Sequence, residues 1–253
     1  MNCTETSQAD LDCMTWALEC EGDTSILDAM AKQGIDLHKN IVEFTQYEPM
    51  LIGRGVQIDE HAATNIPGLY AAGDETGNFR SDIAGAGVMG RIAGESAAEY
   101  VKTTENTADV TALPAVQQAI EFYSSLMERK KGANWKELNM AVQQIMADYA
   151  GIDRVRSENM LSTALKYLND LERFAKKSLK ANDSHELMRA LEAFDLLLVG
   201  ELICTTAIER KETRGMHKRS DYTFTNPLLN GKFVVVKNEN GQPVCSWRDK
   251  YSS

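Results

Sequence analysis

Residues 65–94, "NIPGLYAAGDETGNFRSDIAGAGVMGRIAG", decide how this chain is interpreted. The segment contains G-A-G-V-M-G at positions 85–90, which matches the dinucleotide-binding fingerprint G-x-G-x-x-G. The fingerprint requires a hydrophobic strand that leads directly into its first glycine, and an acidic residue about 20 positions later. Here "NFRSDIA" precedes the glycines and "YVKTTENTADV" follows the helix, so neither requirement is met. The pattern instead predicts a helix over residues 83–102 with a face of glycine and alanine.

Such a helix is costly, because each glycine destabilises a helix by roughly 1 kcal/mol relative to alanine. The benefit of a glycine face is that the backbone can approach a sheet or a ligand closely. We therefore expect this helix to pack tightly against one of the two.

The residues upstream of the helix predict a strand, "GVQID", then a turn, "NIPG", and a short buried strand, "LYAAG". Asp74 follows the strand at its carboxyl end, where open α/β sheets bind ligands. The start of the next helix directs its amide groups and its positive dipole end to the same place. Asp74 can accept hydrogen bonds from sugar or ribityl hydroxyls, or it can simply cap a strand–turn–helix. The spacing alone leaves both interpretations open.

The rest of the chain is mostly helical in pattern, and within residues 1–46 two short helices are expected in "ADLDCMTWALECEGD" and "TSILDAMAKQG", the second stopping at Gly34. Four helices are expected, over residues 114–132, 134–151, 157–181 and 183–211, with caps at Asn134 and at Asp183 or Ser184 and with the third helix following Ser157. Short connections make consecutive helices antiparallel neighbours, so we expect an up-down bundle with the most apolar helix, residues 183–211, at its centre. The tail "GKFVVVKNENGQPVCSWR" predicts a β-hairpin that turns at Asn240 and Gly241.

Composition limits the classes of function. The 253 residues include 27 Lys and Arg against 37 Asp and Glu, a net charge of −10, which argues against binding to nucleic acid or anionic membranes. No apolar run reaches the roughly 18 residues of a spanning helix, and the polar, acidic start is not a signal peptide. Five cysteines without a C-x-x-C pair and four scattered histidines predict reduced thiols, a cytoplasmic location and no metal site.

Three segments together resemble one family. "IPGLYAAGD" with "GRIAG", then "MADYAGIDRVRSENMLSTALKYLNDL", then "AIERKETRGMHKRSDYTFTNP", occur in that order within residues 47–227. They resemble the C-terminal region of the succinate dehydrogenase/fumarate reductase flavoprotein superfamily, which includes aspartate oxidases and adenylylsulfate reductases. The third segment is similar to the family signature "ERxESRGAHxRxDYP".

The resemblance implies an α+β, predominantly α fold: part of an FAD-binding α/β domain, then an antiparallel helical bundle, then a C-terminal β-hairpin. Residues 1–46 would be a remnant of the capping domain, 47–111 the last segment of the FAD-binding domain, 112–225 the bundle and 226–253 the hairpin tail. The family's opening G-x-G-x-x-G, which holds the ADP half of FAD, has no counterpart here.

The resemblance also implies roles for individual residues. Asp74, after Gly73, would bind the ribityl chain of FAD. The loop and helix start that would meet the pyrimidine end of the flavin are Ser81, Asp82, Ile83, Ala84 and Gly85. The signature residues Arg214, His217 and Arg219 would clamp the bundle to the FAD domain by ion pairs.

The chain departs from fumarate-type members where the substrate binds. The stretch "YEPMLIGRGV" has Met50 near the place of the family's substrate histidine. The substrate arginine is not aligned, which leaves Arg80 and Arg54 as candidate catalytic residues. The substrate is therefore expected to be a small molecule of unspecified class.

We expect the chain to be the C-terminal part of an FAD-dependent oxidoreductase that transfers hydride between this substrate and the flavin. The alternative is a non-catalytic fragment or a helical interaction module. Its partner would be an N-terminal FAD-binding half or an electron-transfer subunit.

Overall fold

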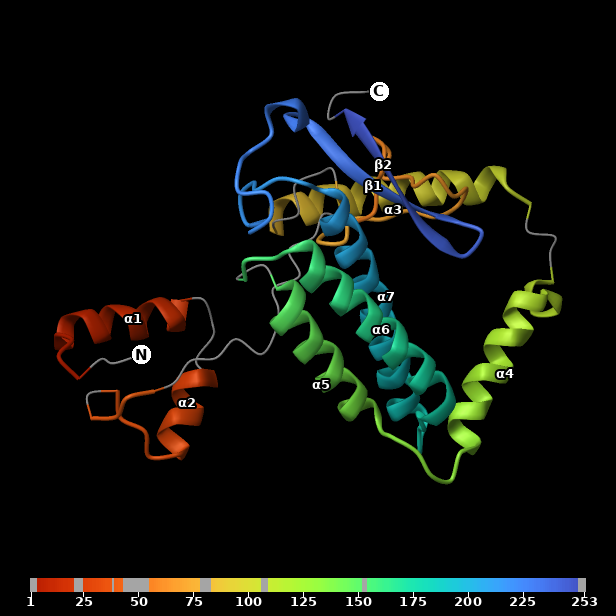
Figure 1. The fold of residues 1–253 in the computed structure, drawn as a ribbon. Coiled ribbons are helices and arrows are strands. Elements are labelled where there is room, and N and C mark those ends of the chain that lie inside the picture. The colour runs from red at the N-terminus through yellow and green to blue at the C-terminus, as the bar shows by residue number, and fades with distance from the viewer. Residues whose placement is uncertain are drawn as a thin grey trace. The chain divides into compact units, whose positions relative to one another are not determined.

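The computed structural model of the protein describes residues 4–20, 25–37, 39–42, 55–77, 83–105, 109–151 and 154–249. The chain divides into two compact units, Met1–Tyr47 and Glu48–Ser253. Within the described residues the fold is predominantly helical, with seven α-helices and one two-stranded antiparallel sheet, as the sequence predicts (Figure 1).

The first unit contains α1 (Gln8–Cys20) and α2 (Ser25–Lys32). Helix α2 ends just before Gly34, whose φ of +68° continues the chain in the left-handed conformation that glycine adopts without strain. The amide of Ile35 then donates to the carbonyl of Met30 at 2.9 Å, which closes the helix end. Both helices lie where the sequence pattern predicts them.

The second unit begins with residues 55–77, which pack along α3 (Ile83–Thr103) through a small core of Ile58, Ala62 and Met89. Figure 1 shows this segment in orange beside the yellow helix α3. The strands expected in "GVQID" and "LYAAG" appear only as isolated bridges, Val56 with Thr76 and Ala63 with Tyr70. Neither run forms a longer ladder, because no further strand pairs with it among the described residues.

The bundle consists of α4 (Pro114–Glu128), α5 (Trp135–Ile145), α6 (Glu158–Ser178) and α7 (Ser184–Glu209). The predicted caps are confirmed. Asn134 and Glu137 form a reciprocal capping box, while the Ser157 and Asp183 side chains accept from amides in the first turns of α6 and α7. Helix α5 ends in a single π-helical turn, Met146–Ala150, which the sequence pattern does not predict.

Helix α7 is the centre of the bundle, as predicted, because it contacts α4, α5, α6 and both strands. The core around it includes Leu138 of α5 and Leu161 and Leu168 of α6, all buried. Gly200 brings α7 close to its neighbours, since a Cβ there would lie 3.1 Å from Leu168 Cδ1.

The predicted hairpin is present as β1 (Lys232–Glu239) and β2 (Gln242–Asp249), with Lys232 opposite Asp249. Asn240 and Gly241 both have positive φ, the geometry of a tight hairpin turn. The hairpin is tied to the end of α7, because Trp247 Nε1 donates to Glu209 Oε1 at 2.8 Å. None of the helices in the described ranges is both long and apolar enough to cross a membrane.

Candidate functional site

The turn that begins at Gly73 is held by its own backbone and by two neighbouring side chains. Gly73 has φ +93°, a conformation strained for other residues. Its carbonyl accepts from the Thr76 amide at 3.1 Å and from the Thr76 hydroxyl at 2.8 Å. Glu75 turns back and accepts from the Ala72 amide at 3.2 Å. Asp74 therefore stands exposed at the tip, and its carboxylate has no hydrogen bond or ion pair with any described residue.

The turn lies against the beginning of α3. A Cβ built on Gly73 would lie 3.9 Å from Ala86 Cβ, so Gly73 and the first turns of α3 are neighbours. Ile83 and Ala84 form the exposed start of the helix, and Gly85 follows, partly buried. The structure thus brings a free carboxylate and the positive end of a 21-residue helix into one neighbourhood.

Four of the predicted site residues lie outside the described residues. They are Arg54, Arg80, Ser81 and Asp82. Their roles in catalysis and in cofactor binding stay predictions.

The glycine face of α3 is open within the described part of the chain. A Cβ on Gly87, Gly90 or Gly94 would meet no heavy atom within 4 Å. The glycines of α3 were expected to let its backbone pack closely against a sheet or a ligand. At Gly87, Gly90 and Gly94 no described residue packs that closely.

The second candidate is the signature segment, whose charged residues together with Arg156 form what we call the arginine cluster. Its members are Arg156, Arg210, Glu212, Arg214, His217, Arg219 and Asp221. The cluster lies where α6 begins, where α7 ends and where the π-helical turn of α5 ends.

Arg219 is almost fully buried, at 1% exposure, and all three of its guanidinium nitrogens donate. Two of them bind the Asp221 carboxylate at 2.7 Å each, and the third donates to the Ala207 carbonyl at 2.8 Å near the end of α7. Asp221 also accepts from the Glu158 amide, the first of α6, at 2.8 Å. These hydrogen bonds, chiefly those from Arg219, hold the pKa of Asp221 well below its ordinary value.

Glu212 is fully buried and receives several donors at once. Its carboxylate accepts from Arg214 Nε at 2.8 Å, pairs with Arg210 Nη2 at 2.7 Å and accepts from the Asn226 amide at 2.8 Å. Burial acts to raise the pKa of Glu212, but these hydrogen bonds and the two arginine charges outweigh it, so the pKa lies below its ordinary value.

His217 bridges two elements through both ring nitrogens. Nδ1 lies 3.0 Å from Arg156 Nη1, and Nε2 lies 2.9 Å from the Arg210 carbonyl. Because arginine offers no acceptor, we assign Nδ1 as the acceptor and Nε2–H as the donor, which makes the ring neutral. Burial lowers the pKa of His217 and the charges of Arg156, Arg219 and Arg210 lower it further, against the raising effect of the Arg210 carbonyl.

Arg156 completes the cluster from the other side. Its Nε donates to the Ala150 carbonyl at 2.8 Å, and its backbone pairs with that of Arg219 in a parallel bridge. The contacts of Arg219 and Asp221 join the end of α7 and the start of α6 to residues 212–226, and that of Arg156 joins the residues before α6 to the end of the π-helical turn. The clamp to the FAD segment, predicted for Arg214, His217 and Arg219, stays a prediction.

Sequence reasoning singled out three members of this cluster and missed Arg156, Arg210, Glu212 and Asp221. The signal for Glu212 and Asp221 was their position inside the same signature, where acids alternate with arginines. Arg156 lies some 60 residues earlier, and only the fold brings it to His217.

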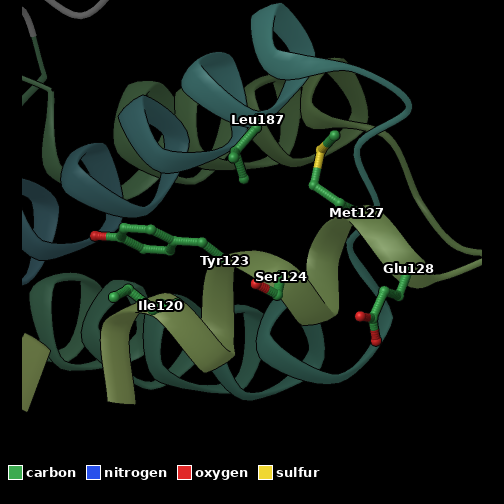
Figure 2. Close-up of a pocket in the computed structure, with 6 residues that line it drawn as sticks. All are labelled: Ile120, Tyr123, Ser124, Met127, Glu128 and Leu187. Carbon is green, nitrogen blue, oxygen red and sulfur yellow. The ribbon is translucent and has the colours of Figure 1, made fainter. Parts of the chain in front are cut away.

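An apolar hollow of about 390 Å³ lies between α4 and α7. Figure 2 shows its six lining residues, five from α4 and Leu187 from α7. Its wall is mostly carbon, with only Glu128 charged, so it brings together no set of groups that could perform a reaction. Among the described residues no group of histidine, cysteine and acidic side chains is arranged to hold a metal ion.

Comparison with known proteins gives the chain its family. The model for "Fumarate reductase flavoprotein C-term" matches residues 139–249. An uncharacterized FAD-dependent oxidoreductase of Methanocaldococcus jannaschii is 29% identical over 227 residues, 83% of this chain and 39% of that protein. The L-aspartate oxidase of Yersinia pestis is 32% identical over 214 residues, 78% of this chain and 36% of the oxidase.

The fold is shared with solved structures of the same group. Adenylylsulfate reductase from Archaeoglobus fulgidus superposes with a TM-score of 0.70 at 22% identity, over 99% of this chain and 46% of the reductase. The chain spans about two fifths or less of the length of the curated relatives named above. With the glycine-containing turn, the arginine cluster and the helical bundle all in place, the chain belongs to the succinate dehydrogenase/fumarate reductase flavoprotein superfamily and corresponds to the C-terminal part of its members.

Proposed function

We propose that the protein is the C-terminal part of an FAD-dependent oxidoreductase, in which residues 73–85 contact the flavin. The observation that carries this proposal is the packing of the Gly73 turn against the start of α3, which leaves Asp74 without a partner among the described residues. In this proposal residues 47–111 are the last segment of the FAD-binding domain and residues 1–46 a remnant of the capping domain.

The groups at the turn fit the flavin half of FAD. Asp74 offers carboxylate oxygens to the ribityl hydroxyls, and the start of α3 offers positive charge to the electron-rich pyrimidine edge. Gly73 allows the turn to form, since a Cβ there would be strained and would lie 3.2 Å from Glu75 Oε2. Bound FAD would supply the redox chemistry, exchanging hydride with a small-molecule substrate at N5 of its ring.

The ADP half of FAD requires residues that the described segment does not offer. We propose that an N-terminal FAD-binding half, either continuous with this chain or a separate polypeptide, holds that part of the cofactor. Arg54 and Arg80 are our candidates for anchoring an anionic group of the substrate. The four described cysteines are free thiols, which supports a reducing compartment, and we place the protein in the cytoplasm.

A titration with FAD tests the proposal. Flavin fluorescence is followed as the chain is added, alone and together with the N-terminal half of an aspartate oxidase relative. Asp74→Ala removes charged hydrogen-bond acceptors, each worth about 1.5–3 kcal/mol, so we expect FAD affinity to fall about ten- to a hundredfold. Glu60→Gln is the matched control, since Glu60 is an exposed acid close in sequence.

The proposal is wrong if Asp74→Ala and Glu60→Gln bind FAD equally well. The alternative function is a helical interaction module, and it is favoured by the self-contained core of the bundle. Binding of an electron-transfer subunit by a chain that never acquires flavin would support that alternative.

A further inference from the structure

Two short segments reverse the charge of the chain locally. Residues 129–136, "RKKGANWK", and residues 173–180, "RFAKKSLK", each carry four lysines or arginines and no acid. The whole chain has a net charge of −10, so these segments stand out against an acidic background. Such a local concentration of one sign marks a candidate electrostatic contact surface.

The fold joins the two segments into one surface. Ala133 pairs with Leu179 in a parallel bridge, its amide donates to the Ser178 carbonyl at 3.0 Å, and its carbonyl accepts from the Lys180 amide at 2.9 Å. Gly132 permits this approach, because a Cβ there would lie 2.0 Å from the Ser178 oxygen. Figure 1 shows the end of α4, the start of α5 and the end of α6 together at this end of the bundle.

Part of the positive charge is used to hold the surface together. Arg129 Nη1 donates to the Leu179 carbonyl at 2.6 Å and Nη2 donates to the Lys176 carbonyl at 2.8 Å. Lys176 itself pairs with Glu172 at 2.8 Å, and this pair is largely exposed. These contacts fix the backbone that carries the remaining lysines.

Four lysines of this surface are exposed and form no ion pair with the described residues: Lys136, whose ammonium lies 5.6 Å from the centre of the Trp135 ring, and Lys130, Lys131 and Lys177. We call Lys130, Lys131 and Lys177 the basic patch. Apolar side chains lie next to it in the sequence: Phe174 is 57% exposed, and Trp135 is half-buried. Ammonium groups beside exposed aromatic rings can contribute both charge and apolar area to a protein interface.

Acidic side chains flank the two segments in the sequence, and two of them, Asp170 and Glu172, pair with Arg173 and Lys176. Glu128 precedes the first segment and Glu137 follows it, while Asp170 and Glu172 precede the second. A flat anionic membrane or a nucleic-acid duplex would face these carboxylates as well as the lysines, which opposes binding. A narrow chain with a few carboxylates can contact the lysines alone.

We propose that the basic patch docks a short acidic segment of a partner protein. The carboxylates of that segment pair with the ammonium groups of Lys130, Lys131 and Lys177, and its apolar residues lie against Phe174. This proposal does not depend on the flavin site.

A binding measurement with the full chain tests the proposal. The probe is a fluorescein-labelled oligoglutamate peptide, followed by anisotropy in about 0.1 M salt, where the Debye length of about 10 Å limits the influence of distant charges. The patch variant is Lys130→Gln with Lys131→Gln and Lys177→Gln. The matched control is Lys166→Gln with Lys211→Gln and Lys237→Gln, three exposed lysines elsewhere that give the same change in net charge.

We expect the peptide to bind the wild type and the control equally and the patch variant about tenfold more weakly, as three exposed ion pairs together allow. Replacing the same three patch lysines by arginine should retain binding. Equal binding to all variants, or no binding to the wild type, overturns the proposal. Tighter patch-dependent binding to phosphatidylserine vesicles or to duplex DNA overturns it in favour of that polyanion.

Discussion

The two ends of the helical bundle use charge in opposite ways. Where α6 begins and α7 ends, the arginine cluster buries its charges and pairs them, with Arg219 and Glu212 almost inaccessible. Where α6 ends and α7 begins, Lys130, Lys131 and Lys177 are exposed and form no ion pair with the described residues. Helix α6 has 21 residues, and a helix of that length spans about 30 Å. At physiological salt the two ends are therefore electrostatically independent.

The difference separates charge that holds the fold from charge that is available for binding. In the arginine cluster, guanidinium groups replace water at the last carbonyls of α7 and of the α5 π-turn, so removing one leaves buried polar groups without a partner. At the basic patch, water already solvates the ammonium groups. Loss of charge should therefore cost stability at one end and binding at the other.

The largest effect is expected for Arg219→Ala. The substitution strips Asp221 of both its guanidinium hydrogen bonds and leaves the Ala207 carbonyl unpaired, so we expect a loss of about 3–5 kcal/mol in the free energy of unfolding. Urea denaturation followed by circular dichroism measures it. Lys211→Ala, at a nearby exposed position, should change stability by no more than about 0.5 kcal/mol. A similar small change for both variants would remove the distinction between the two ends.

Glu212→Gln should have the next largest effect. The amide keeps the shape of the side chain but leaves Arg210 and Arg214 without a buried counter-charge, at a cost of about 2–3 kcal/mol. The pKa of Glu212 is lowered in the folded protein, so its contribution is complete above the unfolded pKa and is lost as pH falls through the folded value. Stability measured from neutral to acid pH should fall less steeply in the variant. Parallel curves would show that Glu212 does not carry this dependence.

His217→Gln should cost roughly 1 kcal/mol at neutral pH, the value of an imperfectly replaced hydrogen bond. The pKa of His217 is lowered in the folded protein, so the unfolded chain binds a proton first as pH falls below about 6.5. Wild-type stability should therefore decline below that pH, and the decline should be smaller in the variant. His185→Gln, at an exposed position, is the matched control for the loss of an imidazole.

The sequence predicts local features of the fold well, because the signals are local. Asn134, Ser157 and Asp183 cap the helices they were expected to cap, since each bonds to an amide only two or three residues away. The strands expected within residues 55–77 are present only as isolated bridges. The apolar pattern of a segment does not show whether a neighbouring strand is available to pair with that segment.

The candidate site likewise has features with local sequence signals and features that depend on long-range packing. Gly73 and Asp74 could be found from their position between a buried run and a helix, but the packing of the turn near Ala86 appears only in the folded structure. The signature arginines could be found as a motif, whereas their pairing with helix-end carbonyls and with Arg156 depends on long-range packing. The basic patch also depends on such packing, since its two segments are joined through Ala133 and Leu179.

The smallest effect on stability is expected at the basic patch. Lys130→Gln, Lys131→Gln and Lys177→Gln together should change the free energy of unfolding by less than about 0.5 kcal/mol per site, because no described residue forms an ion pair with these lysines. Removing like charges that lie close together can even stabilise the protein slightly, and added salt should then reduce that gain. Urea denaturation at low and high salt measures both quantities. A loss comparable with that of Arg219→Ala would mean that the lysines hold the fold, and the contrast between the two ends of the bundle would fail.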